Sequence, residues 1–458
     1  MSGRQVPNHY LSSVDRTESF RTAFEAELDR LHPGPGKLLV AVSGGPDSVA
    51  LLDLLAGASA QRGLILVVGH VDHGIHPSSA MVAGGVRRLA AAYQLSLIER
   101  RLMLGSGTSE TIARTARYAA LEAMRREVGA ELIVTAHHAD DQAETVLMRT
   151  LRGSGPAGLA AMAPRRGRLL RPLLPFRRAE LAQHLLQVGL TAWDDPANAD
   201  SSHLRSWVRR EVMPRLAERL PDVSDRLLEV AYQARVNRVA WDSLLDVLPN
   251  LDLRAEPEGI SVSLKALEAV DDNLLTCLVM AICRRTGFSP GPARLDRVFN
   301  LIRQGRSGTQ VPLGLDRMAE RSFDRLRLIR SASPLPVSGA LELAVPAGAA
   351  DWSAWRFTWS VGPAPVRQDR AGTTAWFEAE RLLVRACRSG DRLSPLGGRG
   401  RRLIVRCLQE ARIPRSRRAG WPALEHQGTV VWVPGVCRSD RLVPVPGAEA
   451  LRVDAELA

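Results

Sequence analysis

Apolar residues follow two alternating patterns over the first third of the chain. Short apolar runs without period-two polarity are typical of strands that are buried on both faces. They alternate with longer stretches in which apolar residues recur at helical spacing. The expected strands are 38–42, 64–71, 96–103 and 131–136, and the expected helices are 48–55, 79–93, 109–128 and 139–152. This alternation predicts an α/β domain with a parallel, doubly wound sheet and helices on both faces.

The pattern becomes mainly helical after residue 153. A helix at 17–31 precedes the first strand, and the later expected helices are 177–188, 207–220, 223–248, 263–270, 273–286 and 293–304. Short strands are expected at 309–313, 326–330 and 429–433. A chain of 458 residues is too long for one ordinary domain. We expect an extension (1–36), a catalytic α/β domain (37–221), a helical middle domain (222–330), a linker or irregular β segment (331–375) and a small α+β C-terminal domain (376–458).

The candidate phosphate loop, residues 43–48, has the sequence Ser-Gly-Gly-Pro-Asp-Ser and joins the first strand to its helix. Two glycines allow a tight turn that brings backbone N–H groups close to an anion, and the helix N-terminus adds its positive dipole end. The spacing matches neither GxxxxGK[ST] nor GxGxxG. The competing interpretation is an ordinary glycine turn. The candidate ATP ligands here are Ser43, Gly44, Gly45, Pro46, Asp47 and Ser48, with Asp47 also the candidate Mg²⁺ ligand.

Three further groups of polar residues fall where ATP or its reaction partner would lie. His73 follows the second strand, where the base and ribose of an adenine nucleotide are expected. Arg114 and Arg117 are three residues apart on one helix face and could clamp phosphates. His137, Asp141 and Glu144 follow the fourth strand at spacings that converge on the carboxyl edge of the sheet. The alternatives for this last group are a helix cap and a zinc site. No third His or Cys lies at ligand spacing, which argues against zinc.

The positive charge of the chain is concentrated in one segment. The formal net charge is +12, from 61 basic and 49 acidic residues. Between residues 385 and 418 there are eleven arginines against Asp391 and Glu410, so much of the excess lies in one C-terminal stretch. This stretch is either a polyanion-binding face or a solvated surface.

The spacing of the cysteines and the hydropathy of the chain indicate the cellular compartment. The five cysteines are widely spaced and contain no CxxC pair, which argues against a disulfide framework and fits a reducing cytoplasm. The first sixteen residues lack the apolar centre of a signal peptide. No uninterrupted apolar run reaches about 18 residues, the length of a membrane-spanning helix. We therefore expect a cytoplasmic protein without a membrane partner.

The ordered motifs resemble a known family. Ser-Gly-Gly-Pro-Asp-Ser after a strand is similar to the loop of the N-type ATP pyrophosphatases, also called the PP-loop superfamily. The later motifs, taken in order over 38–216, resemble the tRNA(Ile)-lysidine synthetase family within it, and a weaker likeness extends over 384–435. His76 and Ser206 depart from the family pattern, which often has arginine and asparagine there.

The resemblance implies a ligase that uses ATP and Mg²⁺. It would join L-lysine to the wobble cytidine of a tRNA(Ile) with a CAU anticodon through an adenylylated C2 oxygen, and it is compatible with a homodimer. The implied catalytic residues are Asp47, Arg117, His137, Asp141 and Glu144. The implied cytidine-binding residues are Asp141 and Asn198, and the implied tRNA-backbone contacts are Arg205, Arg209, Arg399, Arg401, Arg402, Arg415, Arg417 and Arg418.

Two other functions compete with this one. A tRNA thiolase or another PP-loop ligase would share the loop, but thiolases usually carry cysteines near the active site, and all five cysteines here follow residue 276. A non-catalytic RNA-binding protein could keep the nucleotide fold without its activity. The intact loop, Asp141 and Glu144 argue against that class.

Overall fold

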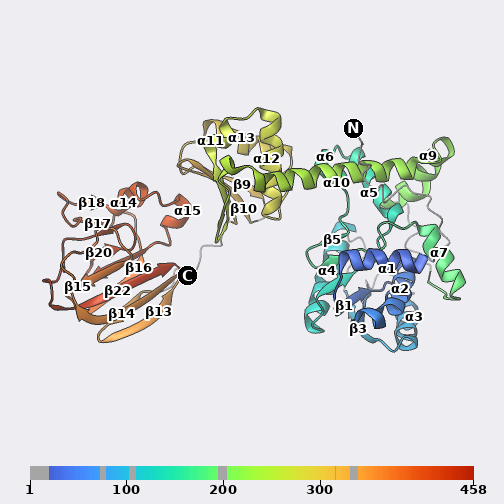
Figure 1. Cartoon of the computed structure of the whole chain (residues 1–458), viewed down its shortest axis with the longest axis horizontal. Helices are drawn as coiled ribbons and strands as arrows, with labels where there is room; N and C mark the ends of the chain where they lie inside the picture. The colour runs from blue at the N-terminus through green and yellow to red at the C-terminus, as the bar shows by residue number, and fades with distance from the viewer. Residues whose placement is uncertain are drawn as a thin grey trace, which may run out of the picture. The chain divides into compact units, whose positions relative to one another are not determined.

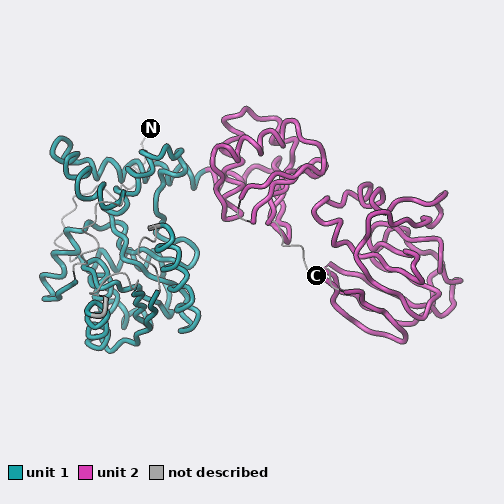
Figure 2. Tube along the Cα trace, turned by 180° about the vertical axis from the view of Figure 1, so that it is seen from behind, with its two compact units in different colours: residues 1–240 teal, residues 241–458 magenta. Residues whose placement is uncertain are grey.

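The chain forms two compact units. The computed structural model describes residues 20–72, 79–102, 110–193, 204–314, 316–330 and 339–457. Unit 1 comprises residues 1–240 and unit 2 comprises residues 241–458 (Figures 1 and 2). No helix in the described ranges combines the length and the apolar character that a membrane span requires.

A six-stranded sheet forms the centre of unit 1, with strand order β3-β2-β1-β4-β6-β5. The strands are β1 (Gly36–Ala41), β2 (Leu64–Asp72), β3 (Ser96–Arg101), β4 (Leu132–Val134), β5 (Arg165–Arg166) and β6 (Leu169–Leu170). All neighbouring strands are parallel except β5, which is antiparallel to β6. The predicted parallel α/β sheet is confirmed, and the short β5–β6 pair was not predicted.

Helices cover both faces of this sheet. The helices of this part of the chain are α1 (Phe20–Leu31), α2 (Pro46–Arg62), α3 (Ser79–Ala92), α4 (Glu110–Glu127), α5 (Ala139–Leu151), α6 (Pro156–Leu159) and α7 (Arg178–Gln187). Leu38 and Val40 of β1 belong to one core with α1, α2, α3 and α7, whereas Leu39 belongs to a second core with α4. Both faces of the strand are therefore apolar, which explains the absence of period-two polarity in the sequence.

A buried carboxylate on α2 ties three other segments to this helix. Asp53 Oδ2 accepts hydrogen bonds from Arg21 of α1 (2.9 Å) and from His184 Nε2 of α7 (2.7 Å). Its Oδ1 accepts one from the Tyr93 hydroxyl, which follows α3 (2.5 Å). Burial would by itself raise the pKa of Asp53, but these hydrogen bonds and the charge of Arg21 lower it below the ordinary value.

We expect Asp53→Asn to lower the free energy of unfolding by about 1–3 kcal/mol at pH 7, because an amide cannot accept all three hydrogen bonds. The lowered pKa of the folded carboxyl means that its contribution is present above the unfolded pKa of about 3.9 and is lost as the pH falls through the folded pKa. The difference between wild type and variant should therefore shrink below about pH 4. Urea unfolding followed by circular dichroism measures it, and a difference independent of pH would contradict the assignment.

The last helices of unit 1 lead into unit 2. They are α8 (Leu204–Trp207), a π-helical turn (Val208–Val212), α9 (Met213–Arg219) and α10 (Val223–Val247). The single helix predicted at 207–220 is thus the last residue of α8, the whole π-helical turn and α9. Such π-helical turns are frequent at functional sites.

The first part of unit 2 packs three helices on a five-stranded antiparallel sheet with order β7-β8-β11-β10-β9. The elements are β7 (Arg254–Glu256), β8 (Gly259–Ser263), α11 (Leu264–Glu268), α12 (Asp272–Arg285), α13 (Pro292–Gln304), β9 (Gln310–Gly314), β10 (Arg317–Ser322) and β11 (Arg325–Arg330). The helices and two of the strands were predicted. The other three strands were missed, because they are short and rich in charged or small residues.

The remainder of unit 2 contains two larger sheets and a two-stranded one. The first has the order β12-β16-β19-β20-β21 and the second β13-β14-β22-β15. The elements are β12 (Leu341–Ala344), β13 (Ala347–Trp352), β14 (Trp355–Pro363), β15 (Thr374–Phe377), β16 (Arg381–Ala386), β17 (Arg392–Leu393), β18 (Arg402–Leu403), α14 (Ile404–Glu410), α15 (Arg415–Arg418), β19 (Pro422–His426), β20 (Thr429–Val433), β21 (Cys437–Arg438) and β22 (Glu449–Leu457).

The structure corrects the expectation of a linker or irregular segment over 331–375. Residues 341–363 form three regular strands, and β14 pairs with β22 over its whole length, from Trp355↔Leu457 to Pro363↔Glu449. A boundary at 376 would therefore separate paired strands of one sheet. The local pattern could not show this, because the partner strand lies far along the chain.

Candidate active site

Two loops meet at the carboxyl edge of the unit 1 sheet, where the strand order reverses. The chain runs from β1 to β2 and β3 on one side, and then returns to place β4 on the other side of β1. The pairing Val40↔Val134 brings the ends of β1 and β4 side by side. The loops after these two strands therefore lie next to each other, at the position where open α/β sheets bind ligands.

The phosphate loop has the geometry that its sequence predicts. Gly44 has a φ of +91°, and a Cβ there would lie 2.7 Å from Val82 Cγ1, so glycine is required by both conformation and space. The Ser48 hydroxyl donates to the carbonyl of Gly45 (2.8 Å) and accepts from the N–H of Ser43 (3.2 Å). The loop is held by its own serines, and α2 begins within it, at Pro46.

Asp47 lies in the first turn of α2, facing the start of α5. Its Oδ2 is 3.5 Å from Nε2 of His138, whose side chain is 1% exposed. Its Oδ1 is buried and has no hydrogen-bond partner among the described residues. An unpaired carboxylate oxygen beside a phosphate loop fits Mg²⁺, which prefers oxygen ligands and is held by few carboxylates together with substrate phosphates.

The adjacent histidines His137 and His138 have pKa values that are shifted in opposite directions. Burial opposes protonation of His138, but the neighbouring carboxylates, chiefly Asp140 and Asp47, outweigh it and raise the pKa of this ring to about 9. Desolvation lowers the pKa of His137 to about 3, against the attraction of Asp141. His137 is therefore a neutral ring, with Nδ1 3.0 Å from the Thr135 hydroxyl. His138 is a cation among carboxylates.

Asp141 and Glu144 of α5 form a compact ionic cluster with two arginines. Arg205 binds Asp141 (2.9 Å) and Glu144 (3.1 Å), and Arg209 binds the same carboxylates at 2.7 and 2.6 Å. Burial would raise the pKa of Asp141, but His138 and the arginines lower it, so the carboxylate stays ionised. Arg205 and Arg209 were predicted to contact the tRNA backbone, whereas here they neutralise the predicted catalytic carboxylates.

The other predicted ligands of unit 1 divide into described and undescribed residues. His73 and Asn198 lie outside the described residues. The guanidinium groups of Arg114 and Arg117 lie 5.1 and 5.6 Å from the ring centre of Tyr118. The charge of Arg114 contributes to the lowered pKa of His137, which places this arginine near the site.

The predicted tRNA contacts in unit 2 differ in their surroundings. Arg399 and Arg401 are exposed, and Arg402 forms an ion pair with Glu410. The arginines of α15 are engaged within unit 2: Arg415 donates to the Gly308 carbonyl, Arg417 pairs with Glu256 and Glu258, and Arg418 donates to the Ile413 carbonyl.

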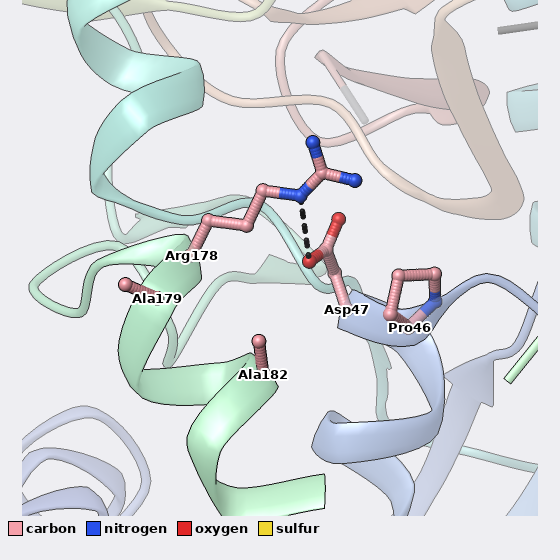
Figure 3. A pocket seen from close by; sticks show the side chains of 5 residues that line it. All are labelled: Pro46, Asp47, Arg178, Ala179 and Ala182. Carbon is pink, nitrogen blue, oxygen red and sulfur yellow. Dashed lines mark ion pairs between the residues drawn. The ribbon is translucent and has the colours of Figure 1, made fainter. Parts of the chain in front are cut away.

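The sequence analysis missed one residue beside the phosphate loop. Arg178, at the first position of α7, lies with its Nε 3.8 Å from Asp47 Oδ1 (Figure 3). A signal was present, because an arginine in the first turn of a helix opposes the helix dipole and is unfavourable unless another interaction compensates for it. Arg177 and Arg178 occupy such positions together.

Comparisons with known proteins agree with the site. The PP-loop domain family matches residues 18–216, and the TilS substrate C-terminal domain family matches residues 382–455. A tRNA(Ile)-lysidine synthase of Alkalilimnicola ehrlichii is 36% identical, covering 89% of this chain and 91% of the relative. Another, from Symbiobacterium thermophilum, is 33% identical, covering 92% and 94%.

A solved structure of a U34-tRNA thiolase from Methanococcus maripaludis is also similar. It is 18% identical, with a TM-score of 0.41, and the match covers 46% of this chain and 76% of that one. The curated relatives, by contrast, match almost from end to end. On that full-length similarity, the chain belongs to the tRNA(Ile)-lysidine synthase family.

Proposed function

We propose that this protein ligates L-lysine to the wobble cytidine of a tRNA(Ile) with a CAU anticodon, with cleavage of ATP to AMP and pyrophosphate. Membership of the family supports this reaction. The observation that carries it is the meeting of the phosphate loop with the start of α5 at one edge of the sheet, where His138 Nε2 lies 3.5 Å from a carboxylate oxygen of Asp47 and of Asp141. The product, lysidine, pairs with A, so the tRNA reads AUA and is charged with isoleucine instead of methionine.

The reaction needs ATP because an amine does not displace the C2 oxygen of cytosine directly. Transfer of AMP to that oxygen breaks the bond between the α- and β-phosphates and releases pyrophosphate. The lysine ε-amine then attacks C2, and AMP leaves with the oxygen. The phosphate loop holds the phosphates, Asp47 holds Mg²⁺, which supplies charge stabilisation to them, and Arg114 or Arg117 balances charge at the α-phosphate.

Asp141 and Glu144 have distinct roles in this proposal. Asp141 accepts a hydrogen bond from the exocyclic amine of the cytosine, as an ionised carboxylate can. Asn198 donates to the same edge of the base. The lowered pKa of Asp141, which Arg205 and Arg209 help to maintain, supports an acceptor role. Glu144 orients or deprotonates the lysine amine. The wobble base must leave the anticodon stack to reach these groups.

We expect the exposed arginines of unit 2 to contribute to tRNA affinity through counterion release. The double variant Arg399→Gln/Arg401→Gln should flatten the slope of log affinity against log salt by about 1 to 2 units. Arg356→Gln, an exposed arginine of β14 outside the basic stretch, is the matched control. Filter binding at several salt concentrations measures the slope. Equal slopes for all three proteins would identify the basic stretch as a merely solvated surface.

The thiolase alternative conflicts with where the cysteines lie. All five belong to unit 2, and unit 1, which carries the phosphate loop, contains none. Thiolases usually deliver sulfur through cysteines close to the site of adenylylation. The distribution of cysteines therefore favours an amine over sulfur as the nucleophile.

The test is incubation of the full chain with ATP, Mg²⁺, labelled L-lysine and a tRNA(Ile) transcript. We expect label in the tRNA with a CAU anticodon and none in a transcript with GAU, together with release of AMP and pyrophosphate. ATP–pyrophosphate exchange without lysine incorporation would point to another PP-loop ligase, and no exchange would point to a non-catalytic module. We place the reaction in the cytoplasm. Sedimentation distinguishes a monomer from a homodimer.

A further inference from the structure

We infer that Arg178 binds the β- and γ-phosphates of ATP, and then the pyrophosphate product, in the pocket between α2 and α7. This inference rests on the proposed use of ATP. It adds to the phosphate loop a ligand from a helix far along the chain, one that neither the motif nor its spacing indicated.

The N-terminal residues of α2 and α7 line this pocket, and the N-terminus of α5 lies beside both helices. The Ala139 N–H at the start of α5 donates to the carbonyl of Phe176, just before α7 (2.8 Å). The N–H of Arg178 donates to Asp140 Oδ2 (2.7 Å). His138, the N-cap of α5, faces Asp47 in the first turn of α2. The positive ends of helices of 17, 13 and 10 residues therefore point toward one place, which favours an anion.

Two nitrogen-bearing side chains near this place have few hydrogen-bond partners. The guanidinium of Arg178 lies 3.8 Å from Asp47 Oδ1, beyond hydrogen-bond distance, and its side chain is 47% exposed. Nε2 of His138 is buried and makes no hydrogen bond within the described part of the chain. The nearest partners of Nε2 are the carboxylates of Asp47 and Asp141, each at 3.5 Å. Phosphate oxygens in the pocket would supply the acceptors that the Arg178 guanidinium lacks.

The pocket has room for such a ligand. It has a volume of about 390 Å³ and is lined by Pro46, Asp47, Arg178, Ala179 and Ala182. Figure 3 shows the Arg178 side chain extending from α7 over Asp47, with the two alanines on the same helix below it. Because the alanines are small, α7 leaves space beside α2 that a larger side chain would fill.

The strand order indicates which phosphates reach Arg178. The nucleoside is expected at the end of β2, which lies on one side of β1, whereas α5 follows β4 on the other side. A triphosphate that starts near β2 and crosses the N-terminus of α2 therefore ends beside α7. Arg178 therefore meets the terminal phosphates and not the α-phosphate, which lies closer to the nucleoside.

The test compares the binding of ATP, AMP and inorganic pyrophosphate, each with Mg²⁺, by calorimetry on the full chain. Arg178→Gln should weaken ATP and pyrophosphate binding by about tenfold or more, because a charge-assisted contact is lost, while AMP binding stays within about twofold. Arg178→Lys should restore part of the loss. Gln183→Ala, an exposed residue of the same helix, is the matched control and should bind all three ligands normally.

A second pair of variants tests the pocket without removing the arginine. Ala182→Glu adds a carboxylate to the lining, and Ala182→Gln adds a side chain of the same size without charge. Pyrophosphate should bind more weakly to Ala182→Glu than to Ala182→Gln. Equal binding by the two proteins would overturn the placement of pyrophosphate in this pocket.

Two other results would overturn the inference. If Arg178→Gln binds pyrophosphate and ATP within about twofold of wild type, Arg178 forms only an ion pair with Asp47, as weak as most exposed pairs. If AMP binding falls as much as ATP binding, the arginine contacts the nucleotide elsewhere. A lysine-incorporation assay distinguishes failure of this inference from failure of the proposed function. A wild type that binds pyrophosphate through Arg178 but incorporates no lysine would refute the function and leave the inference standing.

Discussion

Asp47→Ala should reduce ATP-dependent adenylylation of the tRNA by at least about a thousandfold, since metal-borne charge stabilisation is worth several kcal/mol in a transition state. Affinity for the tRNA should change little. The carboxylate lies beside the phosphate loop, its Oδ1 has no hydrogen-bond partner among the described residues, and its neighbours are the cationic His138 and Arg178. Such a carboxylate is suited to hold a metal ion beside the phosphates, and it contributes little to packing.

Asp47→Asn keeps the shape and removes the charge, so it should be almost as inactive as alanine. Asp29→Ala removes an exposed carboxylate from α1 and should be active. The measurement is transfer of labelled AMP to tRNA, with circular dichroism as the check on folding. An Asp47→Ala protein that adenylylates tRNA at nearly the wild-type rate would show that the metal and the phosphates are held elsewhere.

Arg327→Met should destabilise unit 2 by about 3–5 kcal/mol, the usual cost of leaving a buried charge uncompensated. The Arg327 side chain is 2% exposed and binds Glu320, which is fully buried, at 2.6 Å and Glu256 at 2.8 Å. Methionine fills the space but cannot neutralise these carboxylates. The Ser416 hydroxyl still donates to Glu320 (2.6 Å), but it carries no charge.

Urea unfolding followed by tryptophan fluorescence reports on this change, because all tryptophans except Trp193 and Trp207 lie in unit 2. The double variant Arg327→Met/Glu320→Gln should recover part of the loss, since it removes the stranded charge. Arg254→Gln, which removes an arginine whose side chain is 63% exposed, should leave the free energy of unfolding almost unchanged. A similarly small cost for Arg327→Met would show that the cluster is solvated in solution.

This cluster also changes the interpretation of the basic C-terminal stretch. Glu320 and Glu258 hold Ser416 and Arg417 of α15 against the sheet that contains β8 and β10. The charge of Arg417 is therefore already balanced within the unit. The exposed Arg399 and Arg401 are better candidates for phosphate contacts than Arg417.

The βα alternation and the phosphate loop were predictable because both depend on neighbouring residues. A strand buried on both faces must be apolar throughout, and a loop that turns at a φ of +91° needs glycine at that position, here Gly44. The order of the later motifs can likewise be read directly from the sequence. From these features the parallel sheet, the place of the loop and the family could be derived without coordinates.

The pairing of distant charges and strands was decided by the tertiary structure. No local pattern shows that Arg205 and Arg209 neutralise Asp141 and Glu144, or that β14 lies beside β22. Hydrophobic periodicity reports which face of an element is buried, but not which element covers it. An arginine can pair with any carboxylate that the fold brings within reach. Arg178 acquires its place beside Asp47 for the same reason, because α7 lies far from α2 in the sequence and packs against it only in the folded domain.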